Sequence, residues 1–503
     1  MDLNNIPFSV VEYLRDHSGY QCGYCKSPDT NYSHGMWAHR MNVLSYRHLI
    51  HRGWRRSGKY LYKPTMGKTC CPQYTIIRCD AENFQLSKSQ KKVLKRMHAF
   101  LSNGAKEKTS DTGKSEGELC LSMEQVECPF EPKGSIANTS DILMKDLTKA
   151  SSGSVEKKST PPSSAQNSHK PSNSRPNPPP PVANEQSKAG ATPGVGQDPS
   201  KPLCKKAKIL RMERRAAKLK ASGVTPNILT SPKKTSNEPK SLEDFINSPL
   251  PEHPAHKLEF RLVPVSFKDT EFSKTFPEAF ELFRKYQMSV HKDPPEECDE
   301  KSFKNFLVDG PLSPYKGAGS PPKGFGPFHY QYWLDGELIA VGVLDILPGC
   351  VSSVYFYYDP KYSFLSLGTY SSLREIALTQ ELKGNSELHW LYYMGFYIHS
   401  CPKMRYKKQY TPSYLLCPET YRWVPIEECL PKLDVSKYSR LYDSYVRKEV
   451  LDINKVPCLY NSEKIFYGEL RFLTGSKEMD EVTEYLNFVG EEAANTMLLA
   501  IIH

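Results

Sequence analysis

Long apolar runs, an apolar leader and a nucleotide loop are all missing from this sequence. No stretch approaches the roughly 18 consecutive apolar residues of a membrane-spanning helix. Met1 to Arg15 includes Asp2 and Glu12 and has no apolar segment typical of a secretion signal. No glycine-rich Walker loop is present, which excludes ATP binding of the P-loop class. We therefore expect a cytoplasmic and nuclear protein that does not bind membranes.

The sequence also has too few cysteines for a fold that is held together by disulfide bonds. The chain has 14 cysteines among 503 residues, and apolar residues make up only 38%. In a reducing compartment, clustered cysteines indicate metal or redox sites. The net charge of +11 is typical of a protein with a polyanion partner such as nucleic acid, unless the lysines of a disordered linker supply the excess.

Composition divides the chain into three parts. Residues 1–104 carry recurrent aromatics and end in a basic helix that stops at Gly104, so we predict an ordered N-terminal domain. Residues 105–245 are rich in Ser, Lys, Pro and Asn, which predicts a disordered linker. Its basic segment at 204–220 could be a solvated helix, a nuclear-import signal or an RNA contact. Residues 246–503 regain an apolar pattern and predict a second ordered domain.

The second domain alternates strand and helix patterns. Asp335-Gly336 predicts the type I′ turn of a hairpin, and Ser372 with Glu375 predicts the capping box of a helix. Residues 481–503 predict an acidic amphipathic helix. The order is β, α, β, β, β, α, β, with predicted strands at 258–265, 328–334, 338–347, 351–358 and 388–397. This order predicts an α+β class and resembles the mixed-sheet core of the acetyltransferase-like (GNAT) fold.

Two cysteine pairs predict a thiolate site in the N-terminal domain. Cys22 and Cys25 can face one metal from a tight turn, and the adjacent Cys70 and Cys71 can close the site. Adjacent side chains tend to diverge, which an iron–sulfur cluster tolerates better than a single ion. Zinc stays open, with a nearby histidine replacing one cysteine, and so do free or redox-sensing thiols.

Several motifs together resemble the arginyl-tRNA–protein transferase family. In the N-terminal domain these are Cys22-Gly23-Tyr24-Cys25, Gly35-Met36-Trp37-Ala38-His39, Arg52-Gly53-Trp54-Arg55-Arg56-Ser57-Gly58 and Cys70-Cys71-Pro72-Gln73-Tyr74. In the second domain they are Tyr355-Phe356-Tyr357-Tyr358-Asp359-Pro360, Leu367-Gly368-Thr369-Tyr370-Ser371, Tyr397 through Lys407 and Pro412-Ser413-Tyr414-Leu415-Leu416. The likeness covers both ordered regions and leaves out the linker.

This resemblance implies an aminoacyltransferase with its catalytic domain at 246–503. It implies transfer of arginine from Arg-tRNA to the α-amino group of proteins with N-terminal Asp, Glu or oxidised Cys, which marks them for ubiquitin-dependent degradation. It also implies that Cys22, Cys25, Cys70 and Cys71 hold an iron–sulfur cluster, of the 4Fe–4S type, and haem binding is a further candidate.

The chemistry needs positioning more than a covalent apparatus, because the donor is already an activated ester. Cations are needed for an acidic acceptor, and we predict the substrate-binding set Lys403, Arg405, Tyr406 and Lys407. A helix N-terminus at Gly368 and Ser371 is predicted to meet the phosphates of the donor. The candidates for proton transfer are Tyr397, His399 and Asp359, although a lone histidine is more often structural.

Two other functions compete with this interpretation. An acyl-CoA N-acetyltransferase needs a glycine-rich pyrophosphate loop, and Phe364 to Tyr370 contains a single glycine. A non-enzymatic metal-stabilised adaptor would have no reason to carry the basic, tyrosine-rich segment at 393–407.

Overall fold

Two mixed sheets form the framework of the protein. The computed structural model describes residues 6–71, 75–104, 240–317, 319–384, 386–446, 450–475 and 479–501. The predicted basic segment at 204–220 and nearly all of the predicted linker lie outside these residues. Within the described part of the chain, no helix is long and apolar enough to cross a membrane.

The seven-stranded sheet has the order β14-β13-β15-β1-β2-β4-β3. The neighbours β1 and β15 run parallel, with Ser9 opposite Met497, and β13 and β15 are also parallel. Its strands are β1 (Ser9–Tyr20), β2 (Asn31–Arg40), β3 (Arg55–Ser57), β4 (Tyr60–Pro64), β13 (Pro457–Tyr460), β14 (Glu463–Phe466) and β15 (Met497–Ala500).

The eight-stranded sheet has the order β12-β11-β5-β10-β9-β8-β7-β6. All its neighbours are antiparallel except β9 and β10. Its strands are β5 (Thr75–Asp80), β6 (Leu258–Pro264), β7 (Gly326–Leu334), β8 (Glu337–Leu347), β9 (Cys350–Tyr358), β10 (Leu391–Tyr397), β11 (Ser413–Leu416) and β12 (Trp423–Pro425). Each sheet therefore takes strands from both of the ordered regions that composition separates.

Helices α6 (Thr270–Tyr286) and α8 (Leu367–Lys383) cover opposite faces of the larger sheet. Phe283 of α6 packs on Tyr357 of β9, with ring centroids 5.7 Å apart. On the other face, a Cβ at Gly342 of β8 would lie 3.0 Å from a carboxyl oxygen of Glu375 on α8. Side chains alternate across a strand, and Gly342 pairs with Phe356, so the two helices meet different faces.

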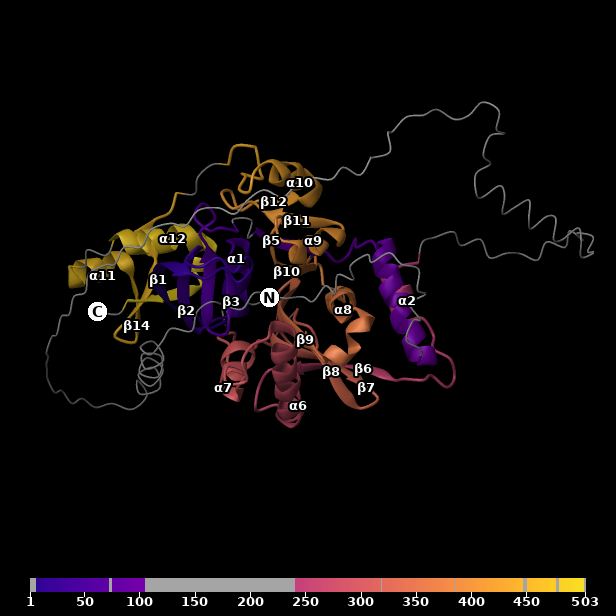
Figure 1. The fold of residues 1–503 in the computed structure, drawn as a ribbon. Coiled ribbons are helices and arrows are strands. Elements are labelled where there is room, and N and C mark those ends of the chain that lie inside the picture. Colours follow the sequence, from indigo (N-terminus) through magenta and orange to yellow (C-terminus); the bar gives the residue numbers. More distant parts are fainter. Residues whose placement is uncertain are drawn as a thin grey trace, which may run out of the picture. The chain divides into compact units, whose positions relative to one another are not determined.

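The remaining helices surround the sheets (Figure 1). The longer ones are α1 (Val43–His51), α2 (Lys88–Asn103), α10 (Ile426–Val435), α11 (Tyr467–Thr474) and α12 (Met479–Ala494). The shorter ones are α5 (Leu242–Ile246), α7 (Glu300–Phe303) and α9 (Pro402–Arg405), with turns of other pitch at 287–291, 304–308, 360–365, 406–409 and 453–455. The capped helix α5 occupies residues that composition assigns to the end of the linker.

Local signals in the sequence predict several of these elements. The hairpin of β7 and β8 turns at Asp335 and Gly336, whose φ values of 51° and 87° confirm the type I′ turn. The capping box at Ser372 is wrong, because α8 begins at Leu367 and the Ser372 hydroxyl donates to the carbonyl of Gly368. The helix expected over 481–503 is also wrong in part, since it breaks at Gly490 and strand β15 follows.

Candidate functional site

The four predicted cysteines meet at one end of the smaller sheet. Cys22 and Cys25 lie on the loop that joins β1 to β2, and Cys70 and Cys71 follow β4. The four sulfur atoms all lie within 4.8 Å of one another, and those of Cys25 and Cys70 are 3.4 Å apart. The amide of Cys70 donates to the carbonyl of Thr30 at 3.0 Å, which fastens the two loops together.

This arrangement fits a metal-binding site. Cys22 and Cys71 are buried, whereas Cys25 is exposed and Cys70 is partly exposed. Burial and the neighbouring Cys22 raise the pKa of the Cys71 thiol far above its ordinary value, so a cation is needed if all four are to be thiolates. A tetrahedral ion with metal–sulfur bonds of about 2.3 Å holds its sulfurs about 3.8 Å apart, close to this spacing. A multinuclear iron–sulfur cluster would require the sulfurs to separate.

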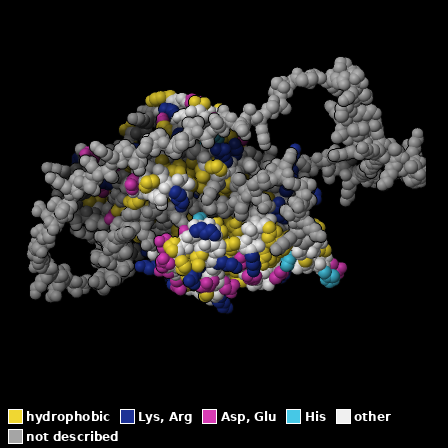
Figure 2. Space-filling view, in the orientation of Figure 1, with side chains coloured by type: hydrophobic (Ala, Val, Ile, Leu, Met, Phe, Trp, Pro, Cys, Tyr) yellow, Lys and Arg dark blue, Asp and Glu magenta, His cyan; other side chains and the backbone are white. Residues whose placement is uncertain are grey.

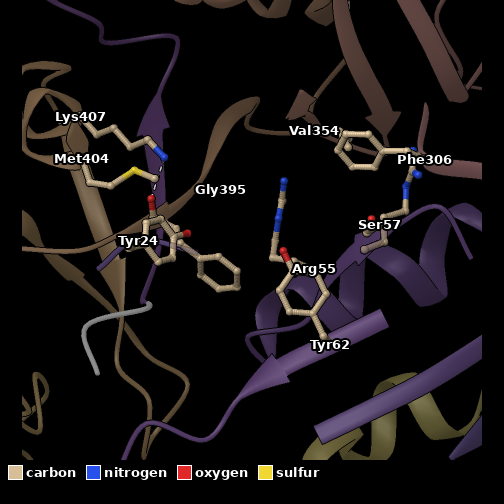
Figure 3. Close-up of a pocket in the computed structure, with 11 residues that line it drawn as sticks. Tyr24, Arg55, Ser57, Tyr62, Phe306, Val354, Gly395, Met404 and Lys407 are labelled. Carbon is tan, nitrogen blue, oxygen red and sulfur yellow. Dashed lines mark hydrogen bonds between the residues drawn. The ribbon is translucent and has the colours of Figure 1, made fainter. Parts of the chain in front are cut away.

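A cavity opens where strands β9 and β10 part. The parallel pairing of these strands ends at Tyr393 opposite Ser352, and Gly395 follows with φ of 73°. The cavity is bordered by β3, β4, β9, β10, the residues after β10, the turn at 304–308 and the cysteine loop. Its lining residues are Tyr24, Arg55, Arg56, Ser57, Tyr62, Phe306, Val354, Gly395, Phe396, Met404 and Lys407. Arg55 extends between Lys407 and Tyr24 on one side and Phe306 and Val354 on the other (Figure 3).

The two arginines of β3 are equally buried and differ in their partners. Arg56 forms a bidentate ion pair with Asp345 of β8, with distances of 2.8 and 2.6 Å. Arg55, which is 4% exposed, donates instead to the hydroxyl of Ser352 and the carbonyl of Ser353 at 2.8 and 2.7 Å. Both of those partners are neutral. Among the described residues, Arg55 therefore forms no ion pair, and the carboxylate of Asp345, opposite Ser352 in the sheet, is paired with Arg56.

Lys407 is a second buried cation in the same cavity. It is 2% exposed, and its Nζ donates to the carbonyls of Met394 and Phe396, both at 2.7 Å. Those two residues flank Gly395, where β9 no longer pairs with β10. Burial, followed by the charge of Arg55, lowers the pKa of Lys407 to about 7. The described structure again supplies no carboxylate partner.

Tyr24 joins the cavity to the cysteine site. It lies between Cys22 and Cys25 in the sequence, and its ring lines the cavity together with Tyr62. Burial raises the pKa of Tyr24 well above its ordinary value, with smaller contributions from Tyr62, Cys401 and Cys22. A change in the cysteine loop therefore reaches the cavity through one side chain.

Two of the predicted proton-transfer residues lie together at a different place. The hydroxyl of Tyr397 and Nδ1 of His399 are 2.9 Å apart, and Nε2 of His399 lies 2.7 Å from Asp434. A surface hollow there is lined by His399, Ser400, Arg405, Lys408, Leu433, Asp434, Val435 and Lys437. It shares no lining residue with the cavity between β9 and β10.

The third predicted residue, Asp359, lies apart from both hollows. Its carboxylate caps the turn at 360–365 and pairs with Lys285 at 2.7 Å. These contacts lower the pKa of Asp359, against the effect of its burial. Asp359 therefore serves as a cap and a salt-bridge partner in this structure.

The predicted substrate-binding residues that the structure describes are divided among four environments. Gly368 and Ser371 form the first turn of α8, and the buried Ser371 hydroxyl donates to the Gly368 carbonyl at 3.0 Å. Arg405 is exposed and donates to the carbonyl of His399 at 2.9 Å. Tyr406 is buried against Tyr410. Lys407 alone of the predicted cations lines the cavity, and the side chain of Lys403 lies outside the described residues.

Sequence reasoning did not assign Arg55 and Tyr24 to this cavity. The sequence leaves two interpretations for the Arg52–Arg56 cluster, a contact with tRNA or a packed Trp54 with its arginines around it. Trp54 is fully buried, and its indole donates to the carbonyl of Phe488 at 3.1 Å. The signal in the sequence was that Arg55 and Arg56 directly follow Trp54, an apolar residue that favours burial. Arginines buried beside it would require specific partners, which is typical of a binding site.

Comparisons with known proteins show the family to which the chain belongs. The family model described as arginine-tRNA-protein transferase, N terminus, matches residues 20–92, and the corresponding C-terminus model matches residues 278–417. The chain is 41% identical over 501 residues to arginyl-tRNA–protein transferase 1 of Drosophila melanogaster, covering 97% of this chain and 99% of that protein.

More distant relatives extend the comparison. Arginyl-tRNA–protein transferase 2 of Arabidopsis thaliana is 36% identical over 472 residues, which cover 84% of this chain and 76% of that protein. An aspartate/glutamate leucyltransferase of Pseudomonas fluorescens is 37% identical over 152 residues, which cover 29% of this chain and 54% of that protein.

Proposed function

The chain belongs to the arginine-tRNA–protein transferase family of aminoacyltransferases, and from this premise we propose that it transfers arginine from Arg-tRNA to the α-amino group of acidic protein N-termini. The observation that carries the proposal is the buried, uncompensated guanidinium of Arg55 beside Lys407. Burying a charge without a counter-charge costs several kcal/mol, roughly. A substrate carboxylate in the cavity would supply the missing charge.

The cavity is better explained as a site for the acceptor than as a site for the donor amino acid. The Pseudomonas relative is named for leucine transfer and for aspartate and glutamate, whereas the insect and plant relatives are named for arginyl-tRNA. If these proteins share a common site, it is better suited to an acidic acceptor than to one donor side chain. Arg55 offers the planar donor geometry that matches a carboxylate. Tyr24, Tyr62 and Phe396 would exclude water around it.

The outer face of α2 is our proposal for the contact with tRNA. Lys88, Lys92 and Lys95 are exposed there, while Val93 and Met97 are buried on the other side of the helix. Lysines along one helix face are suited to a phosphate backbone. By contrast, acidic and basic side chains are mixed on the face that carries α6 and α7 (Figure 2).

The finer assignments of metal, fold, location and pathway are also proposals. The sulfur spacing supports a single ion such as zinc, and the family resemblance supports an iron–sulfur cluster. Metal analysis and the visible absorption of anaerobically purified protein distinguish the two. The strand order β10-β9-β8-β7-β6, with only β9 and β10 parallel, supports an acetyltransferase-like core. The described cysteines are free thiols, which supports a cytoplasmic or nuclear location. The family resemblance supports a role in protein degradation.

A transfer assay tests the main proposal. Purified protein is incubated with [³H]Arg-tRNA and two peptides that differ only in an N-terminal Asp or Gly, with labelled acetyl-CoA as a parallel donor. We expect label only in the Asp peptide and only from Arg-tRNA. Acetyl transfer, or equal labelling of both peptides, would contradict the proposal.

A further inference from the structure

The position of Lys407 in the cavity indicates a role other than binding the acidic side chain. Met394 and Phe396 flank Gly395, where β10 departs from regular strand geometry with φ of 73°, and their carbonyls converge on one side chain. Both accept from Nζ of Lys407 at 2.7 Å. A neutral amine has two N–H donors and one lone pair. The two carbonyls therefore use both donors, and the lone pair is left for the cavity that Lys407 lines.

We propose that Lys407 is the catalytic base that removes a proton from the α-ammonium of the acceptor. This inference rests on the proposed function, because it places the acceptor in the cavity of Figure 3. The carboxylate of an N-terminal Asp or Glu would bind Arg55, which brings the α-ammonium toward the neighbouring Lys407. The guanidinium of Arg55 and the neutral amine of Lys407 then have separate tasks.

The proposed step balances in atoms and charge. One proton passes from the α-ammonium to Nζ of Lys407 and then to solvent. The amine nitrogen attacks the ester carbonyl carbon of the aminoacyl-tRNA, a C–N bond forms and the C–O bond to the ribose breaks. The second amine proton moves to the ribose oxygen as it leaves. The products are an amide, a free tRNA end and one released proton.

The groups around Lys407 keep its amine available near neutral pH. Arg55 on β3 opposes a second positive charge, and the desolvation of Nζ acts in the same direction. Cys401 acts weakly in the opposite direction. Tyr24 of the cysteine loop and Tyr62 of β4 also line the cavity, and neither brings a carboxylate or an ammonium group to it. The α-ammonium has an ordinary pKa of about 8, so the proton transfer is nearly balanced.

The predicted alternative, His399, is less suited to this step. Both of its ring nitrogens already have partners, Tyr397 and Asp434. Its surface hollow does not include Arg55 or Lys407. A base in that hollow would therefore act on an acceptor whose acidic side chain is bound elsewhere.

The test compares Lys407→Arg and Lys407→Ala with the wild type in single-turnover transfer to the Asp peptide between pH 5.5 and 9. Lys408→Arg is the matched control, since Lys408 is exposed beside the buried Lys407. Arginine keeps the N–H donors and cannot act as a base, but its permanent charge beside Arg55 lowers the melting temperature. Below that temperature we expect the Lys407→Arg rate to fall about 100-fold or more, with Arg-tRNA affinity close to wild type. Small primary amines should restore Lys407→Ala, in proportion to their basicity.

A wild-type measurement keeps the inference falsifiable if a variant does not fold. The pH dependence of kcat/KM should have a limb near pH 7 that stays fixed when the α-amine pKa of the peptide is changed. A limb that moves entirely with the peptide would overturn the inference, and so would a Lys407→Arg protein with the wild-type rate and profile. Failure of amine rescue in folded Lys407→Ala would instead give Lys407 a positioning role. If wild-type protein transfers no arginine at any pH, the proposed function itself fails.

Discussion

The cavity between β9 and β10 and the hollow at His399 both contain basic side chains, but these side chains differ in burial and in their partners. In the cavity, Arg55 and Lys407 are buried and contact only neutral oxygens among the described residues. In the hollow, Arg405 is exposed and His399 already pairs with Asp434. An exposed charge is screened by water and salt, whereas a buried charge without a partner interacts strongly with an incoming anion. The density of basic residues in a segment is therefore a poorer guide to the site than burial and missing partners.

The largest effect is expected when Asp345, the carboxylate partner of Arg56, is removed. Asp345→Ala should leave Arg56 buried without a counter-charge and lower the free energy of unfolding by about 3–5 kcal/mol. Chemical denaturation measures this change. The double variant Asp345→Ala, Arg56→Met should recover a large part of the loss. If Asp345→Ala costs less than about 1 kcal/mol, the distinction between the two arginines is wrong.

The next test removes the arginine that has no partner. Arg55→Met should reduce kcat/KM for the Asp peptide about 100-fold or more, because the acceptor carboxylate would be left without its bidentate donor. The measurement is arginyl transfer at several peptide concentrations. Binding of Arg-tRNA should stay within a few-fold of wild type. An equal loss of tRNA affinity would assign Arg55 to the nucleic acid.

Glu375 extends the comparison to a buried acidic group, whereas Arg55 and Lys407 are buried basic groups. It is fully buried and accepts from the hydroxyl of Tyr392 at 2.7 Å, and burial raises its pKa to about 7. In the unfolded chain this carboxyl ionises near pH 4.5. Because the folded pKa is the higher one, Glu375 lowers stability progressively as pH rises from about 4.5 to about 7.

The Glu375→Gln variant isolates this effect. The stability of the variant relative to wild type should increase between pH 4.5 and pH 7.5, by an amount that approaches about 3 kcal/mol. Unfolding by urea at several pH values measures the difference. A difference that is independent of pH would mean that the pKa of Glu375 is the same in the folded and the unfolded protein.

The smallest effect is expected in the exposed hollow. Arg405→Met should change kcat/KM for the Asp peptide by only a few-fold, since exposed charge interactions are worth up to about 1 kcal/mol. His399→Ala should behave similarly at pH 7.5. A loss as large as that of Arg55→Met would move the acceptor site to this hollow and support the prediction from sequence.

Features determined by neighbouring residues could be predicted, and those determined by distant ones could not. The Asp335-Gly336 turn and the helix stop at Gly104 follow from local conformational preference, and both are present. The cysteine site follows from the spacing of four residues. The neutral partners of Arg55 come from β9, and Ser352 lies 297 residues after Arg55 in the sequence. No local sequence pattern predicts a contact between residues so far apart. Lys407 likewise resembles a surface residue in sequence, because the carbonyls that hold it belong to the preceding strand.

The parallel pairing of β1 with β15 has a consequence for how this protein is made. Strand β1 holds the start of the cysteine loop, and one of its edges stays open until Met497 to Leu499 leave the ribosome. The amide of Ser9 then donates to the carbonyl of Thr496, and the hydroxyls of Ser45 and Thr496 come within 2.8 Å. A nascent chain must therefore keep β1 from mispairing while the residues between β1 and β15 are synthesised. Chains terminated before β15 would lack the strand that completes the sheet beside the cysteine site, so they would be early targets for chaperones and proteases.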